Sequence, residues 1–151
     1  MAIKIGDVYS ISTSIGNRCF QVTHNYTKPP RYGYLIRVFK GEFTTLEELA
    51  QQEVQFSVFF PVKRAFKMKL ISFLGNAPVS KSLSEFPVFK DGNINPATKK
   101  VDVWWLWDGE HEKQVGQLSD VELNYPIPEI INDTLLIERI EAGWTARDWG
   151  T

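Results

Sequence analysis

The chain of 151 residues has little of what several classes of protein require. It has a single cysteine, Cys19, so an internal disulfide is excluded, which suits a reducing compartment. No apolar run approaches the ~18 residues that span a bilayer. The first ten residues lack the apolar stretch of a secretory signal. These absences favour a cytoplasmic protein with no membrane partner.

Groups that catalyse reactions are also scarce. There are two histidines, His24 and His111, and Cys19 lies in the strand-like stretch RCFQV, where a packed thiol is expected rather than a nucleophile. The short motifs of serine hydrolases, dinucleotide-binding proteins and P-loop proteins do not occur. Paired carboxylates for acid/base chemistry stay open, because the sequence does not tell which of them meet in space. The sequence predicts a protein that is not an enzyme and that has no cofactor.

The stretch DGEHE is the one candidate metal site. Asp108, Glu110, His111 and Glu112 carry ligand atoms, but no pair of Cys or His residues stands at ligand spacing. A solvated turn explains the same residues, so no metal is predicted.

What the chain does have is the composition of one globular domain. Hydrophobic residues make up 43% and charged residues 23%, which is ordinary for a globular protein. A chain of this length buries about two-thirds of its unfolded surface. We therefore expect a single domain over residues 1–151.

Charge is distributed unevenly along the chain. Residues 1–101 contain 14 Lys and Arg against 7 Asp and Glu, a balance of +7, whereas residues 102–151 contain 3 against 11, a balance of −8. Either the two parts pack together and partly compensate each other, or the last third presents an acidic face to a basic partner. The basic residues are scattered and no aromatic-basic motif occurs, so a nucleic-acid partner is not predicted.

Alternating apolar and polar residues predict a chain made mainly of strands. A first hairpin is expected around a turn at residues 15–17, and a later one around Asp108-Gly109. Further strands are expected at residues 32–43, 54–60, 64–75 and 86–90. In residues 54–60 the side chains expected to face inward are Val54, Phe56, Val58 and Phe60.

Two helices are predicted. TTLEELAQQ, residues 44–52, offers two capping boxes, Thr44 with Glu47 and Thr45 with Glu48. DTLLIERIEAG, residues 133–143, has Asp133 as N-cap and Gly143 as the stop. The predicted class is α+β: a strand-dominated, bent antiparallel sheet or partial barrel with two helices.

The stretch VDVWWLW, residues 101–107, holds three of the five tryptophans. In a strand, Trp105 and Trp107 share a face with Val101 and Val103, and burying one indole removes on the order of 200 Å² from water. We therefore expect this face in the core. Trp104 points the other way, and is expected under the C-terminal helix or in an interface. A carbohydrate platform is the alternative.

Four segments, in order, carry a family resemblance: GDVYSI, FPVFK, WWLWDG and LLIERIEAGW. Together they resemble the immunity protein 26 family of bacterial polymorphic-toxin systems, over residues 6–144. NYTKPPRYGY and residues 77–85 lie outside the resemblance. It implies a cytoplasmic, non-catalytic protein that binds and neutralises a cognate toxin domain. A basic nuclease toxin would suit the acidic last third, because carboxylates can take the place of nucleic-acid phosphates.

The acidic last third also supplies the candidate contacts. The predicted toxin-binding residues are Asp108, Glu110, Glu112, Asp120, Glu122 and Trp104. The first three lie at the expected hairpin tip and the next two lie beside its returning strand, although each carboxylate taken alone is better explained as an ordinary solvated charge. The alternatives from other classes are a small-ligand or carbohydrate-binding module that uses surface tryptophans, and a hydrolase. The oligomeric state is not indicated.

Overall fold

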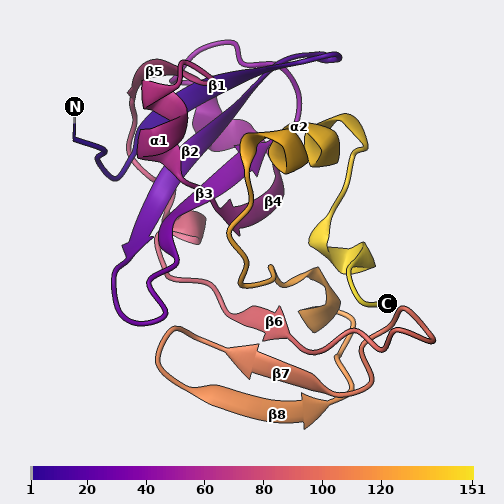
Figure 1. Ribbon diagram of the computed structural model, residues 1–151. Helices are drawn as coiled ribbons and strands as arrows, with labels where there is room; N and C mark the ends of the chain where they lie inside the picture. The colour runs from indigo at the N-terminus through magenta and orange to yellow at the C-terminus, as the bar shows by residue number, and fades with distance from the viewer. Residues whose placement is uncertain (1) are drawn as a thin grey trace.

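Two antiparallel sheets and two helices make up residues 2–151, the part of the chain that the computed structural model describes (Figure 1). The larger sheet has the order β4-β3-β2-β1-β5, formed by Asp7–Thr13 (β1), Gly16–Tyr26 (β2), Gly33–Phe39 (β3), Val54–Phe59 (β4) and Ser72–Asn76 (β5). The smaller sheet has the order β6-β7-β8, formed by Phe89–Asp91, Trp104–Trp107 and Glu112–Gly116. The helices are Val62–Lys67 (α1) and Asp133–Glu141 (α2). The expected strand-dominated α+β class is confirmed, and both sheets are open.

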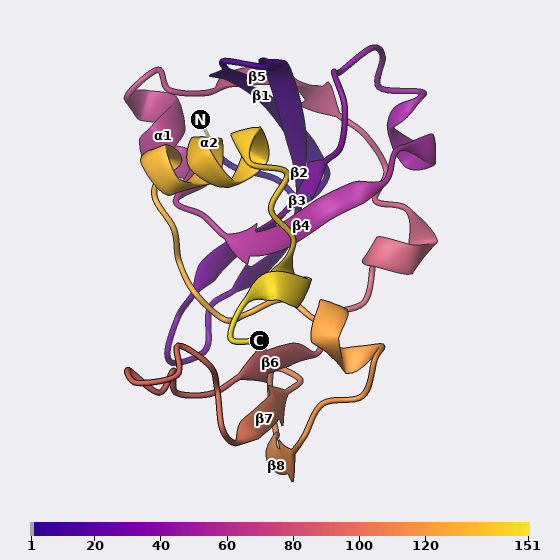
Figure 2. The ribbon, with the colours of Figure 1, turned by 90° about the vertical axis from the view of Figure 1, so that its right-hand side faces the viewer.

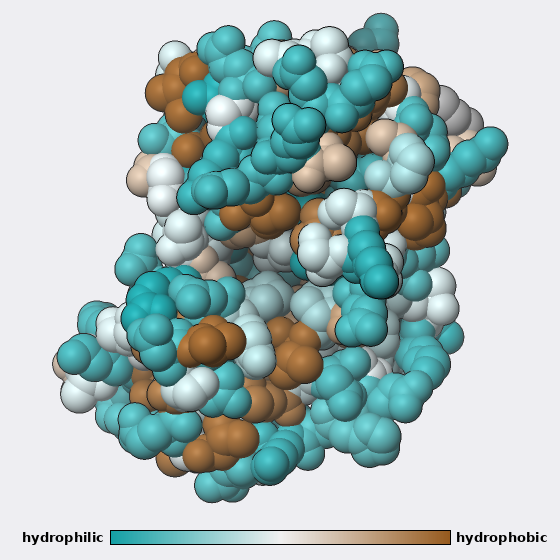
Figure 3. Space-filling model, turned by 180° about the vertical axis from the view of Figure 1, so that it is seen from behind, coloured by the Kyte–Doolittle hydropathy of each residue, from teal (hydrophilic) through white to brown (hydrophobic). Residues whose placement is uncertain are grey.

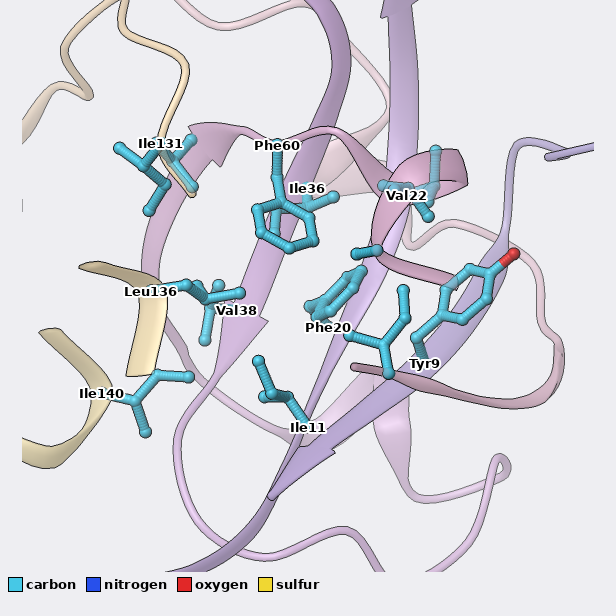
Figure 4. Packing of buried hydrophobic residues seen from close by; sticks show 14 of the residues in the cluster. Tyr9, Ile11, Phe20, Val22, Ile36, Val38, Phe60, Ile131, Leu136 and Ile140 are labelled. Atoms are coloured by element: carbon cyan, nitrogen blue, oxygen red, sulfur yellow. The ribbon is translucent and has the colours of Figure 1, made fainter. Parts of the chain in front are cut away.

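Both faces of the five-stranded sheet are covered. Tyr9, Phe20 and Ile36 belong to one core with residues of α1 and α2, in which Tyr9 lies on the opposite side from Leu136 and Ile140 (Figure 4). The residues next to Tyr9 and Phe20 along their strands point to the opposite face of the sheet. A second core lies there, which consists of Val8, Cys19, Phe39, Leu49 and Ala77. Adjacent residues of one strand are therefore buried alike, because each side of the pleat has its own cover.

Strand β4 follows the predicted alternation only from Phe56 onwards. Phe56 and Val58, together with Phe60 just beyond its end, are buried in the core beneath the helices, as expected. Val54, also predicted to face inward there, is only partly buried and packs against the second core, because the pairing of β3 with β4 shifts register beside it. Phe59 is buried as well, on the opposite face, where it belongs to a third core between the two sheets. The alternation in residues 54–60 predicts one buried face and does not anticipate the burial of Phe59 on the other.

The helix predicted at residues 44–52 is wrong. The segment is irregular apart from one 3₁₀ turn at Leu49–Gln51. One half of a capping box does form, because Thr45 Oγ1 accepts a hydrogen bond of 3.3 Å from the amide of Glu48. A helix of about nine residues is marginal without an apolar face to bury, and only Leu49 of this turn is buried.

The strand predicted at residues 64–75 is wrong in its first part, which forms α1. Val62, Ala65 and Phe66 have helical spacing and pack on the core. The alternation of Phe66 with Met68 and Leu70 suggested a strand, yet Met68 is 56% and Leu70 38% exposed. Strand β5 begins only at Ser72.

Helix α2 begins one residue earlier than predicted and ends as predicted. Asn132, not Asp133, is the N-cap, because its side-chain oxygen accepts a hydrogen bond of 2.9 Å from the amide of Leu135. At the C-terminus, Gly143 adopts φ 64° and donates to the carbonyl of Ile140, while Trp144 donates to that of Arg139. This is the Schellman arrangement, which favours glycine at the left-handed position.

An aromatic junction joins the two sheets. It consists of Leu35, Phe59 and Phe89, with Tyr26, Tyr32, Phe86 and Trp107 packed around them. Phe59 stacks on Tyr32 at 4.8 Å and on Phe89 at 5.3 Å between ring centroids. Trp107 meets Phe89 at 5.2 Å. The place expected for Trp107 is therefore correct, although its partners were not foreseen.

The expected order of burial among the tryptophans is wrong. Trp104 is 4% exposed and packs edge-on against Trp149, whereas Trp105 is only partly buried and Val103 is 43% exposed. The cover comes from the C-terminal segment after α2, where Gly150 O accepts a hydrogen bond of 2.9 Å from the amide of Val101. The alternation of residues 101–107 gives no sign of this cover, so it predicts the wrong inward face.

Two buried cations hold irregular segments against the sheets. Arg37 donates to Thr23 Oγ1 and to the carbonyls of Leu83 and Glu85, and burial lowers its pKa to about 10. Lys90 is fully buried and donates to the carbonyls of Leu123 (2.8 Å) and Trp149 (3.4 Å). Burial is also the main cause that lowers the pKa of Lys90, to about 8.

Replacing Trp104 should destabilise the protein more than replacing Trp105. We expect Trp104→Ala to lower the free energy of unfolding by about 3–5 kcal/mol, as large-to-small changes in a core do. Trp105→Ala should lower it by less, because the indole keeps part of its surface in water. Chemical denaturation of both variants measures the difference. An equal or larger loss for Trp105→Ala would contradict this placement.

Lys90 should make stability rise with pH. Between about pH 8 and its ordinary pKa of 10.5, the folded protein releases the Lys90 proton while the unfolded chain keeps it. The contribution of Lys90 to the free energy of unfolding therefore increases as pH rises through this window. Denaturation profiles of the parent and Lys90→Met should diverge between pH 7.5 and 10 in the parent's favour. The raised pKa of Cys19, about 11, acts in the opposite direction but is common to both proteins. Parallel profiles would show that Lys90 is not the source.

Candidate protein-binding site

The turn between β7 and β8 forms an ordered acidic tip, residues 108–112. Asp108 Oδ1 accepts hydrogen bonds from the amides of Glu110 (2.9 Å) and His111 (2.7 Å), and these bonds lower the pKa of Asp108. Gly109 adopts φ 101°, which the turn signal Asp-Gly anticipates. Asp108 thus shapes the turn, while Glu110 and Glu112 extend into solvent.

The acidic tip is fastened to the end of β2. The hydroxyl of Tyr26 donates a hydrogen bond of 2.8 Å to the carbonyl of Gly109. A side chain at Gly109 would meet the ring of Phe86 at 3.0 Å, so this glycine permits a close approach. Lys28 Nζ lies 3.5 Å from Glu110 in an exposed ion pair. A cavity of about 230 Å³ lies between the tip and this end of β2.

Asp120 and Glu122 lie away from the acidic tip. They follow β8, whose far end is at the opposite end of the hairpin (Figure 1). Arg147 Nη2 binds Asp120 Oδ1 at 2.6 Å. Glu122 accepts a bond of 2.9 Å from the amide of Ser119, whose hydroxyl accepts one from the amide of Glu122, which makes a reciprocal capping box. The structure therefore does not gather the five candidate carboxylates into one face.

The tryptophans are not displayed as a surface platform. Trp104, a candidate contact, is buried beneath Trp149, and the other four are partly buried. This contradicts the expectation that Trp104 meets a partner directly, and it leaves stacking on a sugar without a fully exposed indole. Figure 3 shows that apolar residues gather nonetheless among hydrophilic ones in the lower half of the molecule, over the three-stranded sheet.

The residues that support the acidic tip were missed by the sequence reasoning. Tyr26 and Lys28 belong to NYTKPPRYGY, which lies outside the family resemblance, and Phe86 belongs to an expected strand to which no role is assigned. The pairing of residue 26 with residue 109 leaves no local pattern, because it depends on how the two sheets meet. The turn at Asp108-Gly109 could be predicted from the sequence, whereas the hydrogen bond from Tyr26 that holds it could not.

The side chains that could take part in catalysis, Cys19, His24 and His111, are not grouped in one site. Cys19 is buried, which raises the pKa of its thiol to about 11. His24 contacts Thr23 Oγ1 and the carbonyl of Ser84, both at 2.9 Å, and burial lowers its pKa. His111 is exposed at the tip. Across residues 2–151, no group of three or more His, Cys, Asp or Glu side chains is arranged to hold a metal ion.

Two further searches bear on the site. Of the helices in residues 2–151, none has the length and apolar character needed to cross a membrane. Comparison with protein families, curated proteins and solved structures finds no match to this chain.

Removing the Asp108 carboxylate should loosen the acidic tip alone. In Asp108→Ala the amides of Glu110 and His111 lose their acceptor, so their hydrogen exchange should accelerate several-fold while that of β2 is unchanged. Lowering the pH through the depressed pKa of Asp108 should likewise reduce the protection of these two amides in the parent protein, once the exchange rates are corrected for their intrinsic dependence on pH. Glu112→Ala serves as the matched control. Unchanged exchange in Asp108→Ala would mean that Tyr26 alone orders the turn.

Proposed function

We propose that this chain is a non-catalytic, cytoplasmic bacterial immunity protein that binds and neutralises a cognate toxin domain. The resemblance of its four segments to the immunity protein 26 family motivates the class. The single observation that carries the proposal is the acidic tip. It presents Glu110 and Glu112 on a turn that Asp108 and Tyr26 hold in place.

A fixed turn suits recognition of a protein surface. A backbone turn that is already ordered loses little conformational entropy when a partner binds. Exposed carboxylates accelerate encounter with a basic surface, and their effect weakens as salt screens it. The proposal therefore concerns a partner whose binding face is basic, such as a nuclease that accommodates phosphates.

The candidate contacts differ in exposure and in the bonds that they already form. Glu110 and Glu112 are exposed, so they are the proposed contacts of first importance. Asp108 acts through the shape of the turn. Asp120, held by Arg147, and Glu122, used in a capping box, would contribute only at the margin of a large interface.

Charge reversal at the tip should slow association with the toxin. The toxin domain encoded beside the gene of this protein is the partner to test, since a toxin and its immunity protein are usually neighbours. We expect Glu110→Lys with Glu112→Lys to lower the association rate constant by about tenfold at low salt, and by less at high salt. Surface plasmon resonance at several salt concentrations measures both effects.

A matched double variant controls for net charge. Glu47→Lys with Glu138→Lys changes the charge equally at exposed positions away from the tip, and should leave the association rate close to that of the parent. Equal slowing by both pairs would refute a role for the tip in particular. No binding and no neutralisation of the neighbouring toxin by the parent protein would refute the immunity function itself.

A further inference from the structure

The end of the molecule opposite the acidic tip carries a concentrated positive charge. Helix α1 and β5 lie at the top of both ribbon views, and β7 and β8 at the bottom (Figures 1 and 2). Four cations stand within seven residues, Lys63, Arg64, Lys67 and Lys69, and residues 62–76 contain no Asp or Glu. All four are exposed, and none forms an ion pair within residues 2–151. Four of the 14 Lys and Arg residues in residues 1–101 are thus concentrated in one short segment, while the others remain scattered.

A groove runs beside these cations. It has a volume of about 640 Å³, and we call it the basic groove; its lining includes Lys63, Lys67 and Lys69 together with the apolar Ile3, Phe66 and Phe73. Ile3 and Phe66 are partly buried and also pack on the main core, so this part of the lining is fixed. No carboxylate lines the groove.

Large apolar side chains are exposed among the charges. Phe73, which lines the basic groove, is 44% exposed, whereas the exposed Met68 and Leu70 line a separate cavity together with Arg64. Apolar side chains exposed together on a monomer mark a binding surface more often than isolated ones do. The mixture of cations and apolar groups fits a partner that carries carboxylates and apolar side chains in turn.

Strand β5 offers a free edge beside the basic groove. It ends the five-stranded sheet and pairs only with β1, in which Tyr9 is opposite Phe73 and Ser10 opposite Ser72. Both Ser72 and Phe73 line the groove. An unpaired edge presents backbone N–H and C=O groups that an extended segment can bind.

One of the cations occupies a strained position. Lys69 has φ 61° at the end of α1, where its amide donates to the carbonyl of Phe66 and that of Leu70 to Ala65. This is the same Schellman arrangement in which α2 uses Gly143. A lysine in the left-handed region is less stable there than glycine, so the two helix ends differ in a way that stability does not account for.

We propose that the basic groove binds an extended acidic segment of a protein partner, with apolar side chains between its carboxylates. A concave groove receives a peptide chain better than it contacts a flat bilayer. The exposed apolar groups suit a peptide better than the phosphates of a nucleic acid. A second copy of this chain fits poorly, because its acidic tip, DGEHE, has no large apolar side chain, and head-to-tail contacts would continue without closing.

A labelled synthetic peptide tests the proposal. The probe is a fluorescein-labelled extended peptide in which glutamate alternates with leucine and phenylalanine, compared with peptides in which glutamine replaces glutamate or alanine replaces the apolar residues. Fluorescence anisotropy should show saturable binding of the acidic-apolar peptide, at least about tenfold tighter than either comparison peptide and weaker at high salt.

Charge-reversal variants locate the binding. Lys67→Glu with Lys69→Glu should weaken binding of the peptide by at least about tenfold, whereas Lys81→Glu with Lys113→Glu, an equal charge change at exposed positions elsewhere, should leave it within about twofold. Lys69→Gly gives a second, fold-preserving check. It should raise the thermal midpoint by removing the strained residue, yet weaken binding.

Other outcomes overturn the proposal. Tighter binding of a labelled DNA duplex, or of phosphatidylserine-containing vesicles, would assign the groove to another class of partner. Self-association in sedimentation experiments that the Lys67 and Lys69 reversals abolish would assign it to a second copy. Absence of peptide binding, or equal binding by all variants, would also overturn it. The inference does not rest on the immunity function, since reversal at Glu110 and Glu112 should leave peptide binding unchanged.

Discussion

The stacking of Phe59 between Tyr32 and Phe89 is the contact on which the position of the three-stranded sheet depends. Phe59 belongs to the larger sheet and Phe89 to the smaller one, and few other buried apolar side chains connect the two. Offset aromatic packing of this kind fixes orientation as well as distance, because ring quadrupoles favour particular geometries. The direction of the acidic tip depends on this junction, because Trp107 packs against Tyr26 and the Tyr26 hydroxyl donates to the carbonyl of Gly109.

Polar contacts also help to attach the three-stranded sheet to the rest of the molecule. Arg37 and Lys90 each place a cation in the interior, and carbonyl oxygens of two short 3₁₀ helices, Lys81–Leu83 and Glu122–Asn124, accept their hydrogen bonds. Bonds to a charged donor are stronger than neutral ones, whereas removing the charge from water is unfavourable. The pKa values of both cations are lowered, because burial disfavours their charged forms. Both segments lie next to the three-stranded sheet in the chain, so its attachment combines apolar and charged interactions.

Local sequence pattern predicted the fold class and several strands, but only part of the candidate site. The alternation held from Phe56 to Phe60, where one face of β4 packs on the core beneath the helices, but not at Val54, which packs on the second core. Residues 66–70 show the same alternation without a sheet behind it, and form the last turn of α1 and the segment that follows it. The Asp-Gly turn could be predicted, since Asp108 accepts a hydrogen bond from the amide of His111, only three residues further along the chain. The burial of Trp104 and the anchoring by Tyr26 depend on residues 149 and 109, which are distant in the chain and leave no signal near either aromatic residue.

The cover over Trp104 has a consequence for the order of events during synthesis. A side chain at Gly150 would lie 2.8 Å from both Trp104 and Val101, so the backbone itself closes this face of the smaller sheet. The five-stranded sheet has its last strand once residue 76 has emerged. Strand β7, by contrast, keeps an uncovered tryptophan until residues 149 and 150 arrive. The part of the molecule that bears the acidic tip is therefore the last to mature, and a nascent chain would carry the basic groove well before its opposite end is formed.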